Sequence, residues 1–291
     1  MKSKAHIQLI LSMIIFGTLG IFVRNIPVSS GELALYRAVL ASALIGCCLF
    51  ARRERIPVRH MKKELILLLL SGAAMGFNWI FLFQAYKYTT VSIATLSYYF
   101  APVIVTGLCP LLFREKLTSR QTLCFIMSTL GVALIIGASG FGNSGSDLVG
   151  ISYGLGAAVL YAAVILLNKF IKNVMGIHRT FLQFLAALIV LIPYVSAAGG
   201  FHFMELDTSG WINLLIVGFV HSGLAYCLYF PSLQELKGEQ AAVLSYIDPL
   251  VAVVVSVAVL GEPLTVSQVV GGALILGFAL INEIAPGISE K

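Results

Sequence analysis

Apolar residues run along almost the whole chain in uninterrupted stretches, which short polar segments separate. Each stretch is about 20 residues long, the length that an α-helix needs to cross the hydrocarbon core of a bilayer. The pattern predicts an all-α integral membrane protein with ten transmembrane helices. The predicted helices cover residues 5–23, 30–50, 65–86, 90–113, 119–138, 148–170, 180–198, 210–231, 239–260 and 264–284.

The composition agrees with a chain embedded in lipid. Hydrophobic residues make up 59% of the sequence and charged residues 11%, and the mean hydropathy is +0.96, whereas a soluble domain carries about 25% charged residues. The loops between the predicted helices leave no room for a soluble domain. The first apolar stretch is longer than the roughly 7–15 apolar residues of a secretory signal, so we expect it to remain in the protein as a helix.

Lysines and arginines gather on one side of the predicted membrane. Of the 19 basic residues, all except Arg24, Arg37 and Lys87 lie at chain ends, helix ends or loops on the side that holds both termini. Cytoplasmic loops of membrane proteins carry such an excess of positive charge. We therefore expect a multi-pass protein of the cytoplasmic membrane with both termini in the cytoplasm. The net charge of +6 then reflects the anionic inner leaflet and does not indicate nucleic-acid binding.

The two halves of the chain repeat each other. A shift of 147 positions (246 − 99) places residues 99–121 on residues 246–268, with a tyrosine, a proline, a glutamate, a Leu-Thr pair and a glutamine in register. The repeats predicted from this shift are residues 1–140 and 141–291, with five helices each. Because five is odd, the second half must enter the membrane upside down. Inverted repeats of this kind are typical of secondary transporters, which bind their solute near the membrane midplane.

Several short motifs, in their order and duplication, resemble one membrane-protein family. They are "ELALYR", "LSYIDP", the paired "REKLT" and "GEPLT", and the closing "GGALILGFALI". Together they are similar to the EamA family of the drug/metabolite transporter superfamily, and the resemblance covers essentially the whole chain. It implies ten helices, cytoplasmic termini and movement of small metabolites, often the export of amino acids or related compounds. It does not imply one substrate.

Two prolines indicate where the transport site lies. Pro102 and Pro249 fall at matching positions inside the fourth and ninth predicted helices, where each removes a backbone donor. Irregular backbone is tolerated in a membrane only where it faces protein or a wet cavity. Matched interruptions in two halves are the best sequence pointer to a transporter's binding site, so we expect Pro102 and Pro249 to act as hinges beside the site.

Asp248 is the most informative residue of this region. Its position, about nine residues into the ninth helix, corresponds to a depth of roughly 13 Å in a core about 30 Å thick. Burial disfavours the ionised carboxylate, so Asp248 suits a group that binds a coupling proton in one conformation, or one that pairs with a cationic amine of the substrate. The alternative is a neutral side chain that bonds to a neighbouring helix.

Other polar and aromatic side chains of the predicted helices are candidates for the cavity wall, because aromatic walls with a few fixed polar groups suit a small, partly apolar solute. Arg37 either reaches outward to the interface or lines an outer vestibule, where it meets a substrate carboxylate. An interhelical hydrogen bond would equally account for His221. The remaining candidates are Asn78, Trp79, Tyr98, Tyr99, Tyr226, Ser245 and Tyr246.

The sequence favours a secondary transporter that works by alternating access, first an exporter of amino acids or related amphiphilic metabolites. A drug or organic-cation exporter and a non-transporting membrane sensor are the alternatives. The expected partners are a small solute, membrane lipid and protons, without an obligate protein partner, a cofactor or a metal. An enzyme is not expected, because Asp248 and His221 form at most one dyad within the membrane.

Overall fold

The chain is helical throughout the part that the structure describes. The structure is a computed structural model, and it describes residues 2–51, 53, 58–113, 117–140, 145–174, 176–236 and 238–284. The elements are α1 (Lys2–Gly17), α2 (Leu19–Arg24), α3 (Ser30–Ala51), α4 (Val58–Tyr88), α5 (Val91–Tyr98), α6 (Ala101–Phe113), α7 (Ser119–Gly140), α8 (Gly145–Phe170), α9 (Gly176–Ala197), the 3₁₀ turn η1 (Phe203–Glu205), α10 (Thr208–Leu215), the π-helix η2 (Ile216–Leu224), α11 (Ala225–Glu235), α12 (Gly238–Ser245), α13 (Ile247–Ala258) and α14 (Val266–Ile284).

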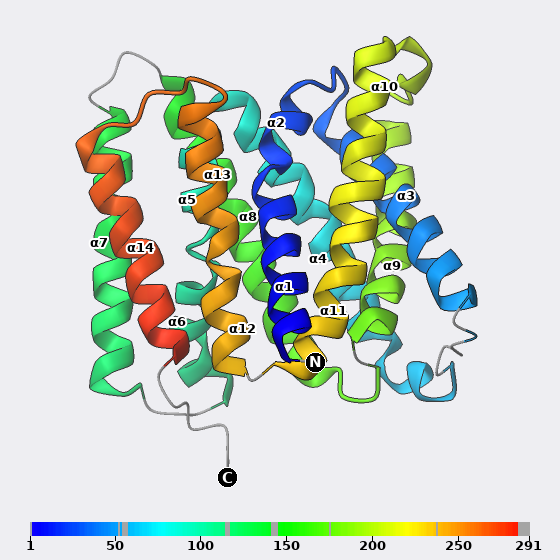
Figure 1. The fold of residues 1–291 in the computed structure, drawn as a ribbon, viewed down its shortest axis with the longest axis horizontal. Coiled ribbons are helices and arrows are strands. Elements are labelled where there is room, and N and C mark those ends of the chain that lie inside the picture. The colour runs from blue at the N-terminus through cyan, green and yellow to red at the C-terminus, as the bar shows by residue number, and fades with distance from the viewer. Residues whose placement is uncertain are drawn as a thin grey trace.

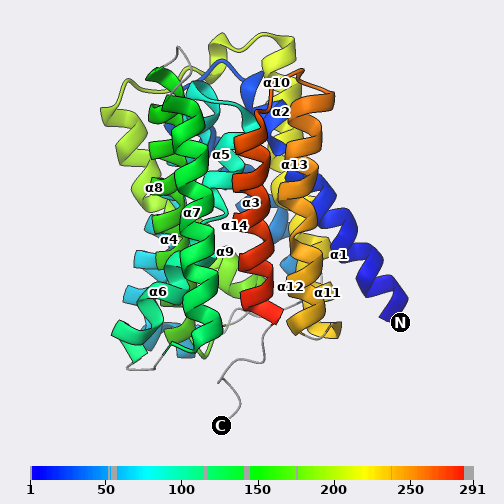
Figure 2. The same cartoon turned by 90° about the vertical axis from the view of Figure 1, so that its left-hand side faces the viewer.

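The helices form one bundle of roughly parallel axes (Figure 1). Helix α1 begins and α14 ends at the same end of the bundle, which we call the terminal end, whereas α2 ends at the opposite, distal end (Figures 1 and 2). Helix α4 packs on α8, α9 and α3, and α7 and α14 pack along each other at one edge.

Eight helical segments are long and apolar enough to cross a membrane, and residues 243–258 and 266–282 form two shorter apolar helices. Helical residues occupy each of the stretches that the sequence marks as apolar. A chain in lipid must satisfy its backbone groups internally, and a helix does this within each segment. The predicted all-helical, multi-pass membrane architecture is therefore confirmed.

Three of the membrane segments are broken. The helix is interrupted at Tyr99, between α5 and α6, and at Tyr246, between α12 and α13. Each break lies just before the proline that the sequence marks, Pro102 or Pro249, because a proline ring disfavours helical geometry in the turn that precedes it. A third break, at Thr18 between α1 and α2, contains no proline and was not predicted from the sequence.

Glycines at GxxxG spacing, Gly72 with Gly76 and Gly150 with Gly154, let the helices approach closely. A Cβ atom at Gly72 of α4 would overlap the backbone oxygen of Gln183 and the side chain of Ala186 in α9. A Cβ atom at Gly150 of α8 would come within 2.5 Å of the Thr89 side chain. These two glycines therefore set how closely α4 packs on α9, and how closely α8 packs on the loop that follows α4.

We predict that Gly72→Ala destabilises the protein, because the new methyl group has no room between α4 and α9 and overpacking costs about 1–3 kcal/mol. The midpoint of thermal unfolding in detergent should fall by roughly 3 °C or more. The matched control is Gly277→Ala in α14, where no atom lies within 4 Å of the added Cβ. Equal midpoints for the two variants would contradict the close packing at Gly72.

Candidate functional site

A cavity of ≈ 350 Å³ lies among the broken helices. This volume is within the range of sites for small molecules, about 300–1,000 Å³. Its wall includes residues of α1, α2, α3, α4, α5, α6, α8, α11, α12 and α13 together with the two tyrosines at the breaks. Segments that are far apart in the sequence, including both predicted hinge regions, therefore meet at one hollow.

Most of the candidates predicted from the sequence lie in this wall, and His221 and Pro249 do not. Pro249 is buried behind the wall, one residue after Asp248. The candidates in the wall are Arg37, Asn78, Trp79, Tyr98, Tyr99, Pro102, Tyr226, Ser245, Tyr246 and Asp248.

Asp248 lies in the first turn of α13, because the break at Tyr246 starts a new helix at this depth. The positive end of a helix dipole stabilises a carboxylate in that position. The Tyr99 hydroxyl also donates a hydrogen bond of 2.6 Å to Asp248 Oδ2. The carboxyl group thus has a helix N-terminus and a hydroxyl donor from the opposite broken helix, which accounts for an acid and a proline side by side in an apolar segment.

The unpredicted break in the first membrane segment also touches this region. A Cβ atom at Gly17 would come within 2.6 Å of the Asp248 carbonyl oxygen and of Val251. Because only glycine fits there, the first segment passes directly against the start of α13. The carboxyl-bearing turn is therefore held between α1 and α5.

Arg37 is buried, with 4% of its surface exposed, and it belongs to the cavity wall. Its Nε atom donates a 2.7 Å hydrogen bond to Ser222 Oγ, and its Cζ atom lies 4.8 Å from the centre of the Trp79 ring. Among the residues whose side chains are described, no carboxylate forms an ion pair with Arg37. The interpretation that Arg37 reaches outward to the interface is therefore wrong, since the side chain turns into the bundle.

Tyrosine rings make up much of the remaining wall. Tyr98 lies 5.8 Å from Tyr99 and 5.3 Å from Tyr161, and Tyr99 lies 6.2 Å from Tyr246, measured between ring centres. The aromatic ring of a tyrosine is apolar and its hydroxyl is polar, so these side chains offer both kinds of surface. The wall suits a solute that has an apolar part and a charged part.

Two amide and hydroxyl candidates already have partners. Asn78 Nδ2 donates to the Ala157 carbonyl of α8 at 2.7 Å, and Ser245 Oγ donates to the Ala241 carbonyl of its own helix at 2.8 Å. The Asn78 amide thus joins α4 to α8, and the Ser245 hydroxyl bonds within α12, just before the break. Arg37 and Asp248 thus carry the charge of the wall.

His221 makes contacts inside the bundle and lies outside the cavity wall. Its Nε2 atom lies 3.1 Å from the Thr18 hydroxyl, at the break in the first segment, and its Nδ1 atom lies 3.3 Å from the Ile216 carbonyl. The Phe22 ring packs on it at 5.0 Å. These contacts match the alternative in which an interhelical hydrogen bond accounts for the histidine.

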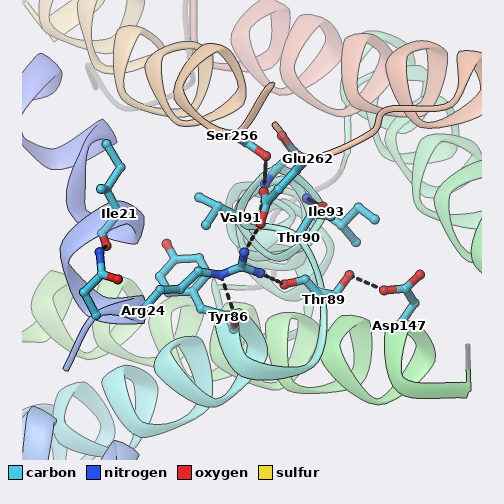
Figure 3. A network of polar contacts seen from close by, with 12 residues as sticks. Ile21, Arg24, Tyr86, Thr89, Thr90, Val91, Ile93, Asp147, Ser256 and Glu262 are labelled. Carbon is cyan, nitrogen blue, oxygen red and sulfur yellow. Dashed lines mark hydrogen bonds and ion pairs between the residues drawn. The ribbon is translucent and has the colours of Figure 1, made fainter. Parts of the chain in front are cut away.

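A polar network lies at the distal end of the bundle, around Arg24 and Glu262 (Figure 3). Arg24, at the end of α2, forms an ion pair with Glu262 in the loop after α13. Its other nitrogens donate to the carbonyls of Tyr86 and Thr89 at the end of α4. The Glu262 carboxylate also accepts from the Val91 backbone N–H at 2.8 Å.

Further contacts extend this network to two more helices. The Ser256 hydroxyl of α13 donates to Glu262, and the Thr89 hydroxyl donates to Asp147 of α8 at 2.8 Å. Glu262 is 8% exposed, so its carboxylate is shielded from solvent, whereas the Arg24 side chain is 31% exposed. The network therefore joins α2, α4, α5, α8 and α13 on the distal side of the cavity.

A helical stripe of α4 that lines the cavity was not predicted from the sequence. Met75, Leu82 and Tyr86 lie in the wall beside Asn78 and Trp79. Their spacing of three and four residues is that of one helix face, so the periodicity alone would have found them from Trp79.

Ser222, which holds Arg37, had no such signal. It is one of many serines in apolar segments, and its role depends on the π-helix that places it. Within the described part of the chain, no three histidine, cysteine, aspartate or glutamate side chains gather as a metal site.

Comparison with known proteins identifies the class. The sequence model of the EamA-like transporter family matches the chain twice, at residues 3–137 and 148–283. A protein of Bacillus subtilis (strain 168), named "Uncharacterized transporter YxxF", is 34% identical over 96% of this chain and 89% of its own length. The chain is a multi-pass membrane protein with the features of a transporter. It belongs to the EamA-like transporter family.

Two further likenesses agree with this assignment. A protein of Salmonella typhimurium (strain LT2) named "Probable amino-acid metabolite efflux pump" is 27% identical over 80% of this chain and 79% of its own length. A crystal structure superposes with a TM-score of 0.62 at 16% identity and covers 97% of both chains, which shows the fold alone. The family and the relatives' names indicate a transporter and not an enzyme.

We predict that the fluorescence of Trp79 changes when a solute enters the cavity. The chain has two tryptophans: Trp79 lies in the cavity wall beneath Arg37, and Trp211 lies in α10 outside it. In Trp211→Phe, titration with a panel of amino acids and amines should change the fluorescence emission for solutes that bind. Trp79→Phe should show no such change. A response that follows Trp211 would place binding outside this cavity.

Proposed function

We propose that this protein is a secondary transporter that exports amino acids, or closely related metabolites with both an amine and a carboxylate, across the cytoplasmic membrane by alternating access. The proposal rests on one observation: Arg37 and Asp248 lie in the same cavity wall, and neither has an ion-pair partner among the described side chains. A zwitterion matches both charges, because its carboxylate binds the guanidinium and its ammonium binds the carboxylate.

Electrostatics make this match selective. A charge held away from water without a partner costs several kcal/mol, and a solute of opposite charge removes that cost when it binds. A solute that lacks either charge leaves Arg37 or Asp248 unpaired, and unpaired polar groups are what lets a site reject an analogue. The tyrosine walls accept an apolar side chain. The name of the Salmonella relative agrees with such a substrate.

The proposed topology has ten crossings in two inverted five-helix repeats, residues 1–140 and 141–291, with both termini in the cytoplasm. The double match of the family model supports the repeat. The equivalent breaks at Tyr99 and Tyr246 also support the repeat. Both tyrosines lie in the cavity wall, with their ring centres 6.2 Å apart. Because α1 begins and α14 ends at one end of the bundle, the number of crossings is even. The positive-inside rule assigns that terminal end to the cytoplasm.

The packing of the broken helices supports a conformation that is open toward the cytoplasm. In the distal half, α5 packs against α13, and the Arg24–Glu262 network lies beside this contact. In the terminal half, α6 continues the segment of α5, and α12 belongs to the segment of α13. There α6 packs on α7 and α8, and α12 packs on α1 and α14. Such a conformation accepts solute from the cytoplasm, which suits an exporter.

Proton coupling follows from competition at one carboxylate. The Asp248 carboxylate binds either a proton or the ammonium of the solute. Each of them neutralises the charge that burial disfavours. A solute released outside is then replaced by a proton, which returns to the cytoplasm on Asp248. Export of solute against its gradient is thereby linked to proton entry.

An organic-cation exporter is the second candidate. The observation that favours it is the cluster of tyrosine side chains beside Asp248, because aromatic faces and a carboxylate bind cations. The buried Arg37 in the same wall counts against a solute with positive charge alone. A comparison of an amino acid with its decarboxylated amine separates the two functions.

We predict that Asp248→Asn in proteoliposomes abolishes accumulation of amino acid against a gradient driven by a pH difference. Asparagine binds no coupling proton, so the driving force has no point of entry. Exchange of labelled for unlabelled amino acid should persist at saturating solute, with a KM about tenfold higher or more, because a charge-assisted contact of about 1.5–3 kcal/mol is lost.

The control for this measurement is Asp207→Asn, at the N-cap of α10, where asparagine caps as well as aspartate. It should retain accumulation. Normal accumulation by Asp248→Asn would remove Asp248 from the coupling mechanism. Loss of exchange at saturating solute would instead make it a binding or structural residue.

We predict that Glu262→Gln opens the distal end more often. Glutamine keeps the shape of the side chain but not the charge that pairs with Arg24. Leu82 lies in the cavity wall and serves as the labelling position. In a chain whose five native cysteines are replaced by alanine, Leu82→Cys should react from outside with a membrane-impermeant maleimide. The reaction should be about tenfold faster after Glu262→Gln, since 1.4 kcal/mol is a factor of ten.

The matched control is Glu205→Gln, which neutralises an exposed acid of η1 near the distal end. It should leave the labelling rate unchanged. An unchanged rate with Glu262→Gln would show that the Arg24–Glu262 pair does not restrain the distal end.

A further inference from the structure

The eighth membrane segment contains a π-helix, Ile216–Leu224, between α10 and α11. Its side chains follow the wider spacing: Ser222 Oγ donates to the Val217 carbonyl, five residues back, at 3.0 Å. Such stretches are rare and are frequently found at functional sites. The question is what this one places.

The packing against α3 shows why the turn is wide. Leu40 and Leu44 of α3 are four residues apart, and they lie against Gly218 and Gly223, which are five apart. A Cβ atom at either glycine would overlap the facing leucine. An α-helix returns to the same face after three or four residues, so only the wider turn keeps both glycines against α3.

The ordinary spacing returns immediately afterwards. Cys227 is four residues beyond Gly223, and its Sγ atom lies 3.6 Å from Sγ of Cys48, four residues beyond Leu44. The extra residue is therefore confined to the turn that contains His221 and Ser222. In a regular helix with Gly218 against α3, position 222 would occupy the α3 face that Gly223 now holds.

Ser222 uses its placement to hold Arg37. The hydroxyl is fully buried, donates to the Val217 carbonyl and accepts from Arg37 Nε at 2.7 Å. With its donor and an acceptor position both used, the hydroxyl cannot turn away. The Trp79 ring lies 4.8 Å from the guanidinium carbon, so a ring and a hydroxyl define the plane and direction of the group.

The held guanidinium leaves its outer edge for a ligand. Among the described residues, the only hydrogen bond of the Arg37 side chain is the one from Nε to Ser222, so Nη1 and Nη2 have no hydrogen-bond partner there, and Arg37 belongs to the cavity wall. Two parallel N–H groups bind a carboxylate in bidentate fashion. The available edge has the geometry for that contact.

We infer that Ser222, set by the π-helical turn Ile216–Leu224, is the residue that positions Arg37 so that the Nη edge binds the carboxylate of the substrate. It sets the preference for a zwitterion over the corresponding amine. This inference rests on the proposed function, because it takes the carboxylate to be part of the substrate.

The test compares Ser222→Ala with wild type for leucine and for isoamylamine, the amine left when leucine loses its carboxylate. In proteoliposomes, the KM for leucine should rise about tenfold or more in the variant, while kcat for leucine and the KM for isoamylamine stay within about twofold. Ser232→Ala is the control, because Ser232 is also fully buried and bonds only within its own helix. It should keep the wild-type ratio.

A second measurement does not depend on the solute. Phenylglyoxal modifies accessible guanidinium groups, and peptide mass spectrometry gives the rate at Arg37 relative to that at Arg179. Arg179 of α9 is a suitable reference because it donates to the Asn168 carbonyl and lies outside the cavity wall. Because the freed group turns in the cavity, Ser222→Ala should raise this ratio about threefold or more, and Ser232→Ala should not. An unchanged ratio would overturn the positioning role of Ser222, whatever the substrate.

The outcomes separate this inference from the proposed function. If wild type prefers leucine and Ser222→Ala keeps the preference, or loses both solutes equally, the inference is wrong and the proposed function stands. If wild type transports isoamylamine and not leucine, the proposed function fails and the inference fails with it. If wild type transports neither solute, the phenylglyoxal ratio decides whether Ser222 holds Arg37.

Discussion

A charge inside a bilayer must have a partner or a polar cavity, because lipid supplies neither. In this chain Arg37 and Asp248 meet that requirement in the same way. Each has one hydroxyl partner from another helix, Ser222 for Arg37 and Tyr99 for Asp248. Neither is neutralised by an ion pair among the described side chains. The structure thus keeps both charges in position in one cavity wall.

The irregular backbone of the bundle serves the same requirement. The break at Tyr246 supplies a helix N-terminus for Asp248, and the π-helical turn supplies the hydroxyl for Arg37. The break at Thr18 links these two features, since Gly17 packs on the Asp248 carbonyl and Thr18 contacts His221 of the π-helix. Backbone that departs from the α-helix is costly in lipid, and here it is collected around the cavity.

Ion pairing is used differently at the distal end. Arg24 and Glu262 form an ion pair there, and Glu262 also bonds the first N–H of α5. An ion pair between two loops and helix ends can break without disturbing the helices themselves. Paired charges therefore lie at the distal end, whereas Arg37 and Asp248 in the cavity wall have no ion-pair partner among the described side chains. This combination suits a site that alternates between two openings.

The sequence by itself determined the class of structure, because length and apolarity of the segments leave a helical membrane protein as the physical solution. It also marked Pro102, Pro249 and Asp248, since a proline or an acid in lipid is costly whatever the fold. Tertiary structure alone decided what Arg37 contacts and that His221 lies outside the cavity wall. It also produced the break at Thr18 and the π-helical turn. These features depend on which helices pack together, and no local pattern encodes the match between Leu40, Leu44 and two glycines five residues apart.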